Sequence, residues 1–354
     1  ARFGHYGLNI EEYSSPSSSI IWPLLLVPWL MLGLGLYGPL VLNVAFAVLT
    51  VLVIHRIIIA CASRAKPEAN VSWVWALLIF FAGNGFGLVL TGMEHSLHVL
   101  VTVCVLYLVL RMQLAADIGG AAPSNTADYL LLSCVVLSPL VRFEGVAISA
   151  FAIAMLVRLG RLRLAMLCVL LIAMSLALYF WMMSVLGLPW LPSSVLVKSE
   201  AAAAVGGQAS FAVKLTGAVT HIMDNISENL RFAEALLLVA VAIGIAALSL
   251  CAWRQGERIS PTYVIGVLAV IVLHLVFGKF GWYGRYQAYV FVFAVCAMPY
   301  LFFGWLFGGT VTKERLIHLG AFAALTVTLL GVPQYLVPLL TTPNAAQNIY
   351  EQQR

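Results

Sequence analysis

The sequence predicts an all-α membrane protein, a bundle of about ten transmembrane helices. Of its 354 residues, 62% are hydrophobic and only 9% are charged, whereas soluble domains average about 25% charged residues. The apolar stretches are continuous rather than alternating, which in a membrane indicates helices rather than a β-barrel. The net charge of +5 is modest and spread over many loops, so no nucleic-acid partner is predicted.

Short polar turns separate the predicted transmembrane helices. These helices cover residues 39–60, 73–90, 94–110, 128–142, 145–158, 163–186, 230–252, 261–278, 287–306 and 316–338. The stretch 20–38 contains two prolines, which favour an interfacial or re-entrant segment over a full span. The predicted organisation is an outer loop over 1–38 with interfacial helices, a bundle over 39–338 with an outer loop at 187–229, and an outer tail over 339–354 leading to a further domain.

Charge assigns the predicted turns to two sides of the membrane. One side collects eleven basic residues against five acidic ones, and short cytoplasmic loops are the ones enriched in Lys and Arg. The basic residues on this side are Arg56, Arg64, Lys66, Arg111, Arg158, Arg161, Arg163, Arg254, Arg258, Lys313 and Arg315. The chemically unusual stretches all fall on the opposite side, so the function is expected to be extracytoplasmic.

The turn VRFEG joins two predicted helices that are short for a span. The stretches 128–142 and 145–158 hold 15 and 14 residues, whereas crossing a bilayer takes about 20. Arg142 and Glu144 are therefore expected below the membrane surface, where charged side chains are costly and commonly functional. The alternative is a structural ion pair that ties the turn together.

The turn TGMEHSLH places a carboxylate and two histidines at the same outer face. Glu94 near Arg142 and Arg285 suits chemistry on a lipid phosphate, because guanidinium groups neutralise phosphate and a carboxylate can act as a base or bind a divalent cation. Alternatively, Glu94 stabilises the start of the following helix. His95 and His98 are predicted to lie on one helix face. They could serve as metal ligands there, or they are ordinary interfacial polar groups.

Aromatic residues surround two cations in the predicted outer turn near residue 282. Lys279 and Arg285 flank an aromatic cluster that is either an interfacial belt or a floor for a sugar ring, made of Phe280, Trp282, Tyr283 and Tyr286. The outer loop at 187–229 adds Lys198 near its start. The six cysteines lie in apolar stretches without ligand-like spacing, so they are predicted to pack in the core, with no disulfide or zinc site.

Five stretches, in the right order, resemble motifs of the GT-C superfamily of integral membrane glycosyltransferases, in particular bacterial enzymes of the terminal arabinofuranosyltransferase type. ARFGHYGLNIEEYSSP resembles the family's first outer loop, with Glu12 where glycine is usual. TGMEHSLH is similar to its Ser-Gly-Met/Leu-Glu-Thr turn, and VRFEG to its Thr-Arg-Pro-Glu-Gly turn, with Phe143 in place of proline. LPSSVLVKS at 191–199 resembles its Leu-Pro-Asn-Ser/Thr stretch ending in lysine, and GRY at 284–286 matches its Gly-Arg-Tyr.

The resemblance implies a bacterial plasma-membrane enzyme whose active site faces the periplasm or the cell exterior. The donor would be a sugar, with a pentofuranose as one candidate, on a polyprenyl phosphate, and the acceptor a glycan or glycolipid of the cell envelope. The implied phosphate contacts are Arg142, Lys198 and Arg285. The implied catalytic or base-supporting carboxylates are Glu11, Glu94 and Glu144. The implied substrate contacts are His95, Tyr283 and Tyr286.

The mechanism implied by the resemblance is an inverting displacement. A carboxylate accepts the proton of an acceptor hydroxyl, which attacks the anomeric carbon while the lipid phosphate leaves toward cations. Family members carry an acidic pair just before the Ala-Arg that opens this chain, so the catalytic base is expected upstream of Ala1. A divalent metal is compatible with this scheme but not required by it.

Other membrane functions share some of these features. A flippase or transporter of a lipid-linked sugar would have similar hydropathy, but transporters usually show repeated halves and polar residues at mid-membrane. No repeat is visible in this chain, and most charges cluster at one end of the predicted spans. The pattern therefore favours an enzyme over a transporter. The ordered motifs argue against a polymerase or ligase of polyprenyl lipids, and the sunken Arg142–Glu144 turn argues against a purely structural subunit.

Overall fold

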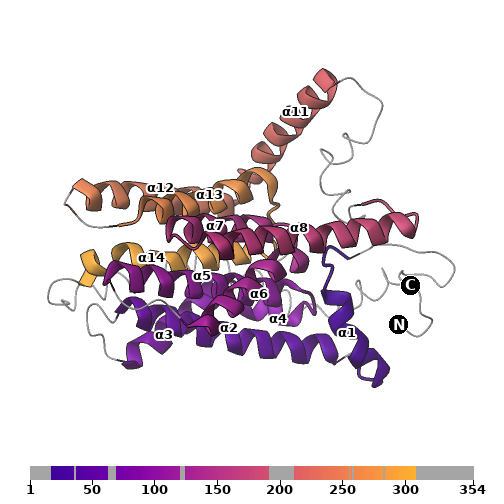
Figure 1. Cartoon of the computed structure of the whole chain (residues 1–354), viewed down its shortest axis with the longest axis horizontal. Helices are drawn as coiled ribbons and strands as arrows, with labels where there is room; N and C mark the ends of the chain where they lie inside the picture. The colour runs from indigo at the N-terminus through magenta and orange to yellow at the C-terminus, as the bar shows by residue number, and fades with distance from the viewer. Residues whose placement is uncertain are drawn as a thin grey trace.

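The computed structural model describes residues 17–35, 37–62, 69–119, 124–190, 211–254, 256, 259–281 and 284–307. Within these residues the regular elements are all helices (Figure 1). The prediction of an all-helical fold is therefore confirmed for this part of the chain. The predicted span 316–338 and the tail 339–354 lie outside it.

Within the described residues, four helices are long and apolar enough to cross a membrane. They are α2 (Gly38–Ala62), α5 (His95–Asp117), α8 (Leu162–Val185) and α12 (Ala233–Arg254). Their mean hydropathies over the most apolar windows lie between 2.1 and 2.7, and a span needs about 20 apolar residues. The chain is therefore a helical membrane protein, while the full count of ten spans stays a prediction.

Shorter apolar helices complete the bundle. They are α1 (Trp22–Met31), α3 (Ala69–Ala82), α4 (Gly85–Leu90), α6 (Asn125–Val141), α7 (Gly145–Arg158), α13 (Pro261–Phe277) and α14 (Ala288–Phe307). With 17 and 14 residues, α6 and α7 are short for a bilayer, as their sequences predict. Between α1 and α2 the chain reverses, and Gly38 N–H donates to the Leu34 carbonyl at 2.9 Å.

The centre of the bundle is α5. Its side chains are buried along most of its length, and it packs against α2, α6, α7 and α14. The outward face of α8 differs, because Leu170, Met174, Leu178 and Trp181 are 55 to 64% exposed. An apolar surface of this kind is stable against lipid tails and unstable in water. The burial pattern therefore supports a membrane environment independently of helix length.

The predicted span 73–90 is broken into α3 and α4. Asn84 adopts a left-handed backbone with φ of 56°, and glycines lie on both sides of it. A Cβ atom on Gly83 would lie 2.3 Å from Val292 Cγ2 of α14, so this glycine allows α14 to approach closely. The helix breaks because the local sequence permits a left-handed residue and the packing requires a bare backbone.

The predicted outer loop 187–229 contains a helix, α11 (Phe211–Asn229). Figure 1 shows α11 projecting away from the other helices. Its apolar residues recur at helical spacing and alternate with polar ones, so it carries an apolar stripe rather than a continuous apolar run. Asn225 and Asn229 donate to backbone carbonyls at the end of α13, including Gly278 O at 3.1 and 3.0 Å.

Polar side chains gather at the two opposite ends of α5. At its last turn, Gln113 donates to Asp117 at 2.6 Å, Arg158 donates to Gln113 at 2.8 Å, and the Tyr300 hydroxyl donates to Asp117 at 3.0 Å. These bonds join α5, α7 and α14 at that end. The other end of α5, about 35 Å away, begins directly after Glu94 and holds the residues described next.

Candidate functional site

The turn between α6 and α7 is built so that Arg142 points into the protein. Arg142 follows the last residue of α6 in an extended conformation, with φ of −154° and ψ of 142°. The Gly145 N–H donates to the Arg142 carbonyl at 2.8 Å, and the Ser138 hydroxyl donates to the Gly145 carbonyl at 3.1 Å. A Cβ atom on Gly145 would lie 2.3 Å from the Ser138 carbonyl oxygen. Glycine is therefore what lets the turn close.

Arg142 forms a buried ion cluster with two carboxylates. Its guanidinium donates to Glu94 Oε1 at 2.7 Å through one nitrogen and to Glu144 Oε1 at 2.7 Å through another. The side chains of Arg142 and Glu94 are both 3% exposed, whereas that of Glu144 is 30% exposed. The cluster thus consists of a sealed pair and one carboxylate that reaches the surface.

The N-terminal segment before α1 contributes to this cluster. The Ser18 hydroxyl donates to Glu94 Oε1 at 2.9 Å, and the Ile20 N–H donates to the Leu140 carbonyl at 3.0 Å. Ser18 belongs to a run of three serines that is typical of an ordinary loop, so only the folded chain identifies it. Glu94 precedes the first residue of α5, but its side chain caps no backbone N–H there. Its carboxylate instead accepts hydrogen bonds from Ser18 and Arg142.

The ion cluster controls the protonation of Glu144. Burial alone would raise the pKa of this carboxyl, but the Arg142 guanidinium overrides burial and lowers the pKa to about 2. Conversely, burial alone would lower the pKa of Arg142, and the charges of Glu144 and Glu94 raise that pKa above its ordinary value. At neutral pH Arg142 and Glu144 are therefore both charged.

The stability of the parent protein is expected to fall as the pH drops from about 4.5 toward 2. Because the folded-state pKa of Glu144 lies below its ordinary value of 4.5, its ion pair stabilises the fold above that pH and is lost on protonation. Thermal unfolding in detergent of the parent and of Glu144→Gln, across pH 2 to 7, measures this contribution. The parent should lose stability more steeply than the variant in that window. Parallel curves would contradict the lowered pKa.

Tyr286 connects the ion cluster to Arg285. The guanidinium carbon of Arg142 lies 5.4 Å from the Tyr286 ring centroid, and that of Arg285 lies 4.9 Å from it. Arg285 donates to the Tyr286 hydroxyl at 2.9 Å and contacts the Met93 sulfur at 2.7 Å. His95 packs edge-on against Tyr286, at 5.7 Å between ring centroids. Two cations thus share one aromatic ring.

Two buried histidines lie beneath this layer. His98 of α5 packs on the Tyr289 ring with a centroid distance of 4.3 Å, and His274 Nδ1 lies 3.1 Å from the Tyr289 hydroxyl. The Nε2 atoms of both histidines are buried without a hydrogen-bond partner among the described residues. His274 and Tyr289 are not among the predicted site residues. A histidine inside an apolar predicted span is the signal that could have identified His274.

Several predicted site residues do not join this group. Lys279 pairs with Glu228 at 2.8 Å at the surface. Phe280 is buried, and packs on Phe232 and His274, so it cannot form an open floor for a sugar ring. Glu11, Lys198 and Tyr283 lie outside the described residues, as does Trp282.

Metal ligation and cysteine chemistry have little support in the described part of the chain. No group of three or more His, Cys, Asp or Glu side chains lies close enough there to hold a metal ion. All six cysteines are free. Cys61, Cys168 and Cys296 are buried as predicted, whereas Cys251 is exposed on the apolar surface.

The fold and the site together define a helical membrane protein with a buried carboxylate–guanidinium cluster at one end of its bundle. The chain matches no protein-family model, no curated protein and no solved structure. The functional assignment therefore depends on the sequence motifs and on this geometry.

Proposed function

We propose that this protein is an integral membrane glycosyltransferase that moves a sugar from a polyprenyl-phosphate donor to a glycan or glycolipid of the cell envelope. A pentofuranose is the first candidate for the sugar, and the reaction would occur on the extracytoplasmic side of a bacterial plasma membrane. One observation carries the proposal. Glu94, Arg142 and Arg285 come from three separate GT-C-like motifs, yet Glu94 pairs with Arg142 and both arginines pack against Tyr286.

The two arginines have different roles in this proposal. Two guanidinium nitrogens of Arg142 pair with carboxylates, one with Glu94 and the other with Glu144. The contacts of Arg285 include two with neutral groups, the Met93 sulfur and the Tyr286 hydroxyl. An arginine loses less free energy when it gives up a neutral contact than when it gives up a carboxylate, so a neutral contact is more easily replaced by a phosphate. Arg285 is therefore assigned to the phosphate of the donor, with Arg142 as the positioned second cation.

The transfer itself balances as a single displacement. The acceptor hydroxyl oxygen bonds to the anomeric carbon, and the bond from that carbon to the phosphate oxygen breaks, with its electrons staying on the phosphate. The hydroxyl proton passes to a carboxylate base. A carboxylate with a pKa near 2 accepts protons poorly, so Glu144 is assigned to hold Arg142 and to accept hydrogen bonds from the substrate.

Transfer should collapse when Arg285 is replaced by alanine. Labelled sugar on a synthetic polyprenyl phosphate is offered to the purified full-length protein with a cell-envelope acceptor extract. Loss of one positioned charge contact in the transition state is expected to lower the rate by about 10²–10³-fold. Lys279→Ala, which removes a cation from an exposed ion pair, is the matched control and should keep the rate within about twofold. Equal rates for parent and Arg285→Ala would remove the phosphate assignment.

A second candidate function, movement of a lipid-linked sugar across the membrane, is favoured by one observation. Ser96, His98 and Thr102 are buried residues of α5, and each has a side-chain polar atom without a partner among the described residues. Polar groups inside a span often mark a transport path. In the same experiment, proteoliposomes that move the labelled lipid across the membrane without forming a glycosylated product would establish transport instead of transfer.

A further inference from the structure

A small pocket with three polar side chains in its lining lies where the break between α3 and α4 meets the start of α12 and the start of α14. Its lining includes Asn84, Glu234, Gly284 and Gln287. The empty volume is about 250 Å³ when the open solvent at its mouth is included, but the cavity itself offers only about 20 Å³ to the centres of water-sized groups, which is room for a single hydroxyl. Gly284 directly precedes Arg285 in the chain, so the pocket adjoins the proposed phosphate contact.

The most informative residue of this pocket is Gln287. Its side chain is 2% exposed, and both the amide nitrogen and the amide oxygen are buried without a partner among the described residues. A buried carboxamide with neither atom paired is rare, because each atom has lost its hydrogen bonds to water. A ligand that both donates and accepts a hydrogen bond would satisfy it.

The other two polar side chains of the pocket are neutral or negative. Asn84 adopts its left-handed backbone at the helix break, and its side chain lies close to Gly87. Glu234 lies in the first turn of α12. An irregular, polar break inside an apolar segment is tolerated where it lines a cavity. The break therefore has the position expected of a binding feature.

The charges of the lining limit which ligand fits. Among the described residues no Lys or Arg lines the pocket, so an anionic group would meet only carboxamides and a carboxylate there. A hydroxyl group fits, because it can donate to a carboxylate or to an amide oxygen and accept from an amide nitrogen. The chemistry favours a neutral, hydroxylated ligand over a phosphate.

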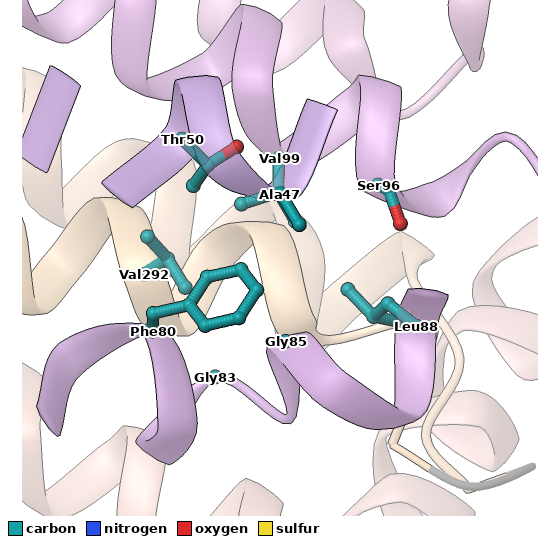
Figure 2. A pocket seen from close by; sticks show the side chains of 9 residues that line it. All are labelled: Ala47, Thr50, Phe80, Gly83, Gly85, Leu88, Ser96, Val99 and Val292. Atoms are coloured by element: carbon teal, nitrogen blue, oxygen red, sulfur yellow. The ribbon is translucent and has the colours of Figure 1, made fainter. Parts of the chain in front are cut away.

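A neighbouring pocket, which shares Gly83 with the first, has no charged residue among its described lining. Figure 2 shows the Phe80 ring among apolar side chains from α2, α5 and α14, including Ala47, Val99 and Val292. Ser96 is a polar group there whose hydroxyl has no partner among the described residues. Both pockets are lined mainly by apolar surface, and the one at Gln287 differs in holding a carboxylate and two carboxamides, which suit a hydroxylated ligand.

We propose that the pocket at Gln287 binds one hydroxyl group of the sugar while Arg285 holds the phosphate that carries it. The inference rests on the proposed function, since it assigns a hydroxyl of the lipid-linked donor's sugar to this pocket. Gln287 and Glu234 then determine whether the protein distinguishes a sugar-bearing lipid from the bare lipid phosphate. The two parts of the donor are recognised by separate residues.

Equilibrium binding, measured without any transfer step, tests this division. The probes are synthetic decaprenyl phosphate and the same lipid carrying arabinofuranose, ribofuranose or mannose, each titrated into the full-length protein in detergent. The parent should bind at least one sugar-bearing lipid more tightly than the bare phosphate. Gln287→Leu should lose about tenfold of affinity for that lipid and keep its affinity for the bare phosphate. Arg285→Ala should weaken binding of both.

Stability separates this role from a structural one. Because Gln287→Leu replaces two unpaired polar atoms by apolar ones of similar volume, the unliganded variant should unfold at the same or a higher temperature than the parent. Ser249→Ala is the control, since Ser249 is a buried residue of α12 with an unpaired hydroxyl among the described residues, about four turns from Glu234. It should leave sugar binding unchanged.

Three results would overturn the proposal. They are equal binding of all four lipids by the parent, an unchanged sugar preference in Gln287→Leu, and a parallel loss of bare-phosphate binding in that variant. Failure of the proposed function looks different. The protein would then bind the sugar-bearing lipid through Gln287 and yet form no transfer product.

Discussion

Replacing Arg142 by methionine is expected to destabilise the protein by about 3–5 kcal/mol. The substitution leaves Glu94, which is 3% exposed, and Glu144 facing each other without the cation that pairs with both. An unpaired buried carboxylate costs far more than the pair contributes, because it has lost its hydration. Thermal unfolding in detergent micelles, with the yield of folded protein, measures the effect.

Two comparisons identify the cause of that loss. Lys279→Met breaks the exposed pair with Glu228 and should cost at most about 1 kcal/mol. The double variant Arg142→Met with Glu94→Gln removes the cation and the sealed carboxylate together, so it should recover part of the stability lost by Arg142→Met alone. A double variant no more stable than Arg142→Met would show that shape, rather than unpaired charge, is what Arg142 supplies.

Gly145→Ala is expected to destabilise the turn that holds the ion cluster, by about 1–3 kcal/mol or more. The added Cβ would lie 2.3 Å from the Ser138 carbonyl oxygen, and backbone cannot move aside as a flexible side chain can. The turn would have to open, moving Arg142 relative to Glu94. Both the unfolding temperature and the sugar-transfer rate should fall.

The matched control is the same substitution at an open glycine. Gly244 lies in the interior of α12, and an added Cβ there would meet nothing within 4 Å. Gly244→Ala should therefore stabilise the helix by about 0.5–1 kcal/mol. If both glycine variants shifted stability in the same direction, the close approach at Gly145 would not be what constrains the turn.

Hydropathy is sufficient to predict most of the helices, because lipid-facing helices need continuous apolar stretches. The same criterion misses α11, whose apolar residues form a stripe and not a run. It also joins α3 to α4, since Gly83, Asn84 and Gly85 do not interrupt the average hydropathy of the stretch. At this helix break, Val292 of α14 approaches Gly83 closely. This tertiary contact cannot be read from the local sequence pattern.

The candidate site is partly accessible from the sequence. Charge counting predicts that the turns holding Glu94, Arg142 and Arg285 share one membrane face, and the structure joins Glu94 to Arg142 and packs both arginines against Tyr286. Their roles toward a sugar or a phosphate stay predictions. Ser18 and Gln287 could not be found, because the significance of a serine in a loop or a glutamine beside a turn depends on what buries it.

The most direct test of the central claim compares two hydrogen-bonded carboxylates at opposite ends of α5. Glu94→Gln removes a charge from the ion cluster while keeping an acceptor for Ser18 and Arg142. Asp117→Asn makes the same change at the far end, where Asp117 accepts from Gln113 and Tyr300. The rate of sugar transfer from polyprenyl phosphate, measured on folded full-length protein, should fall about 10²-fold or more for Glu94→Gln and stay close to the parent for Asp117→Asn. Full activity of Glu94→Gln, or an equal loss in both variants, would contradict an active site at the Glu94–Arg142–Glu144 cluster.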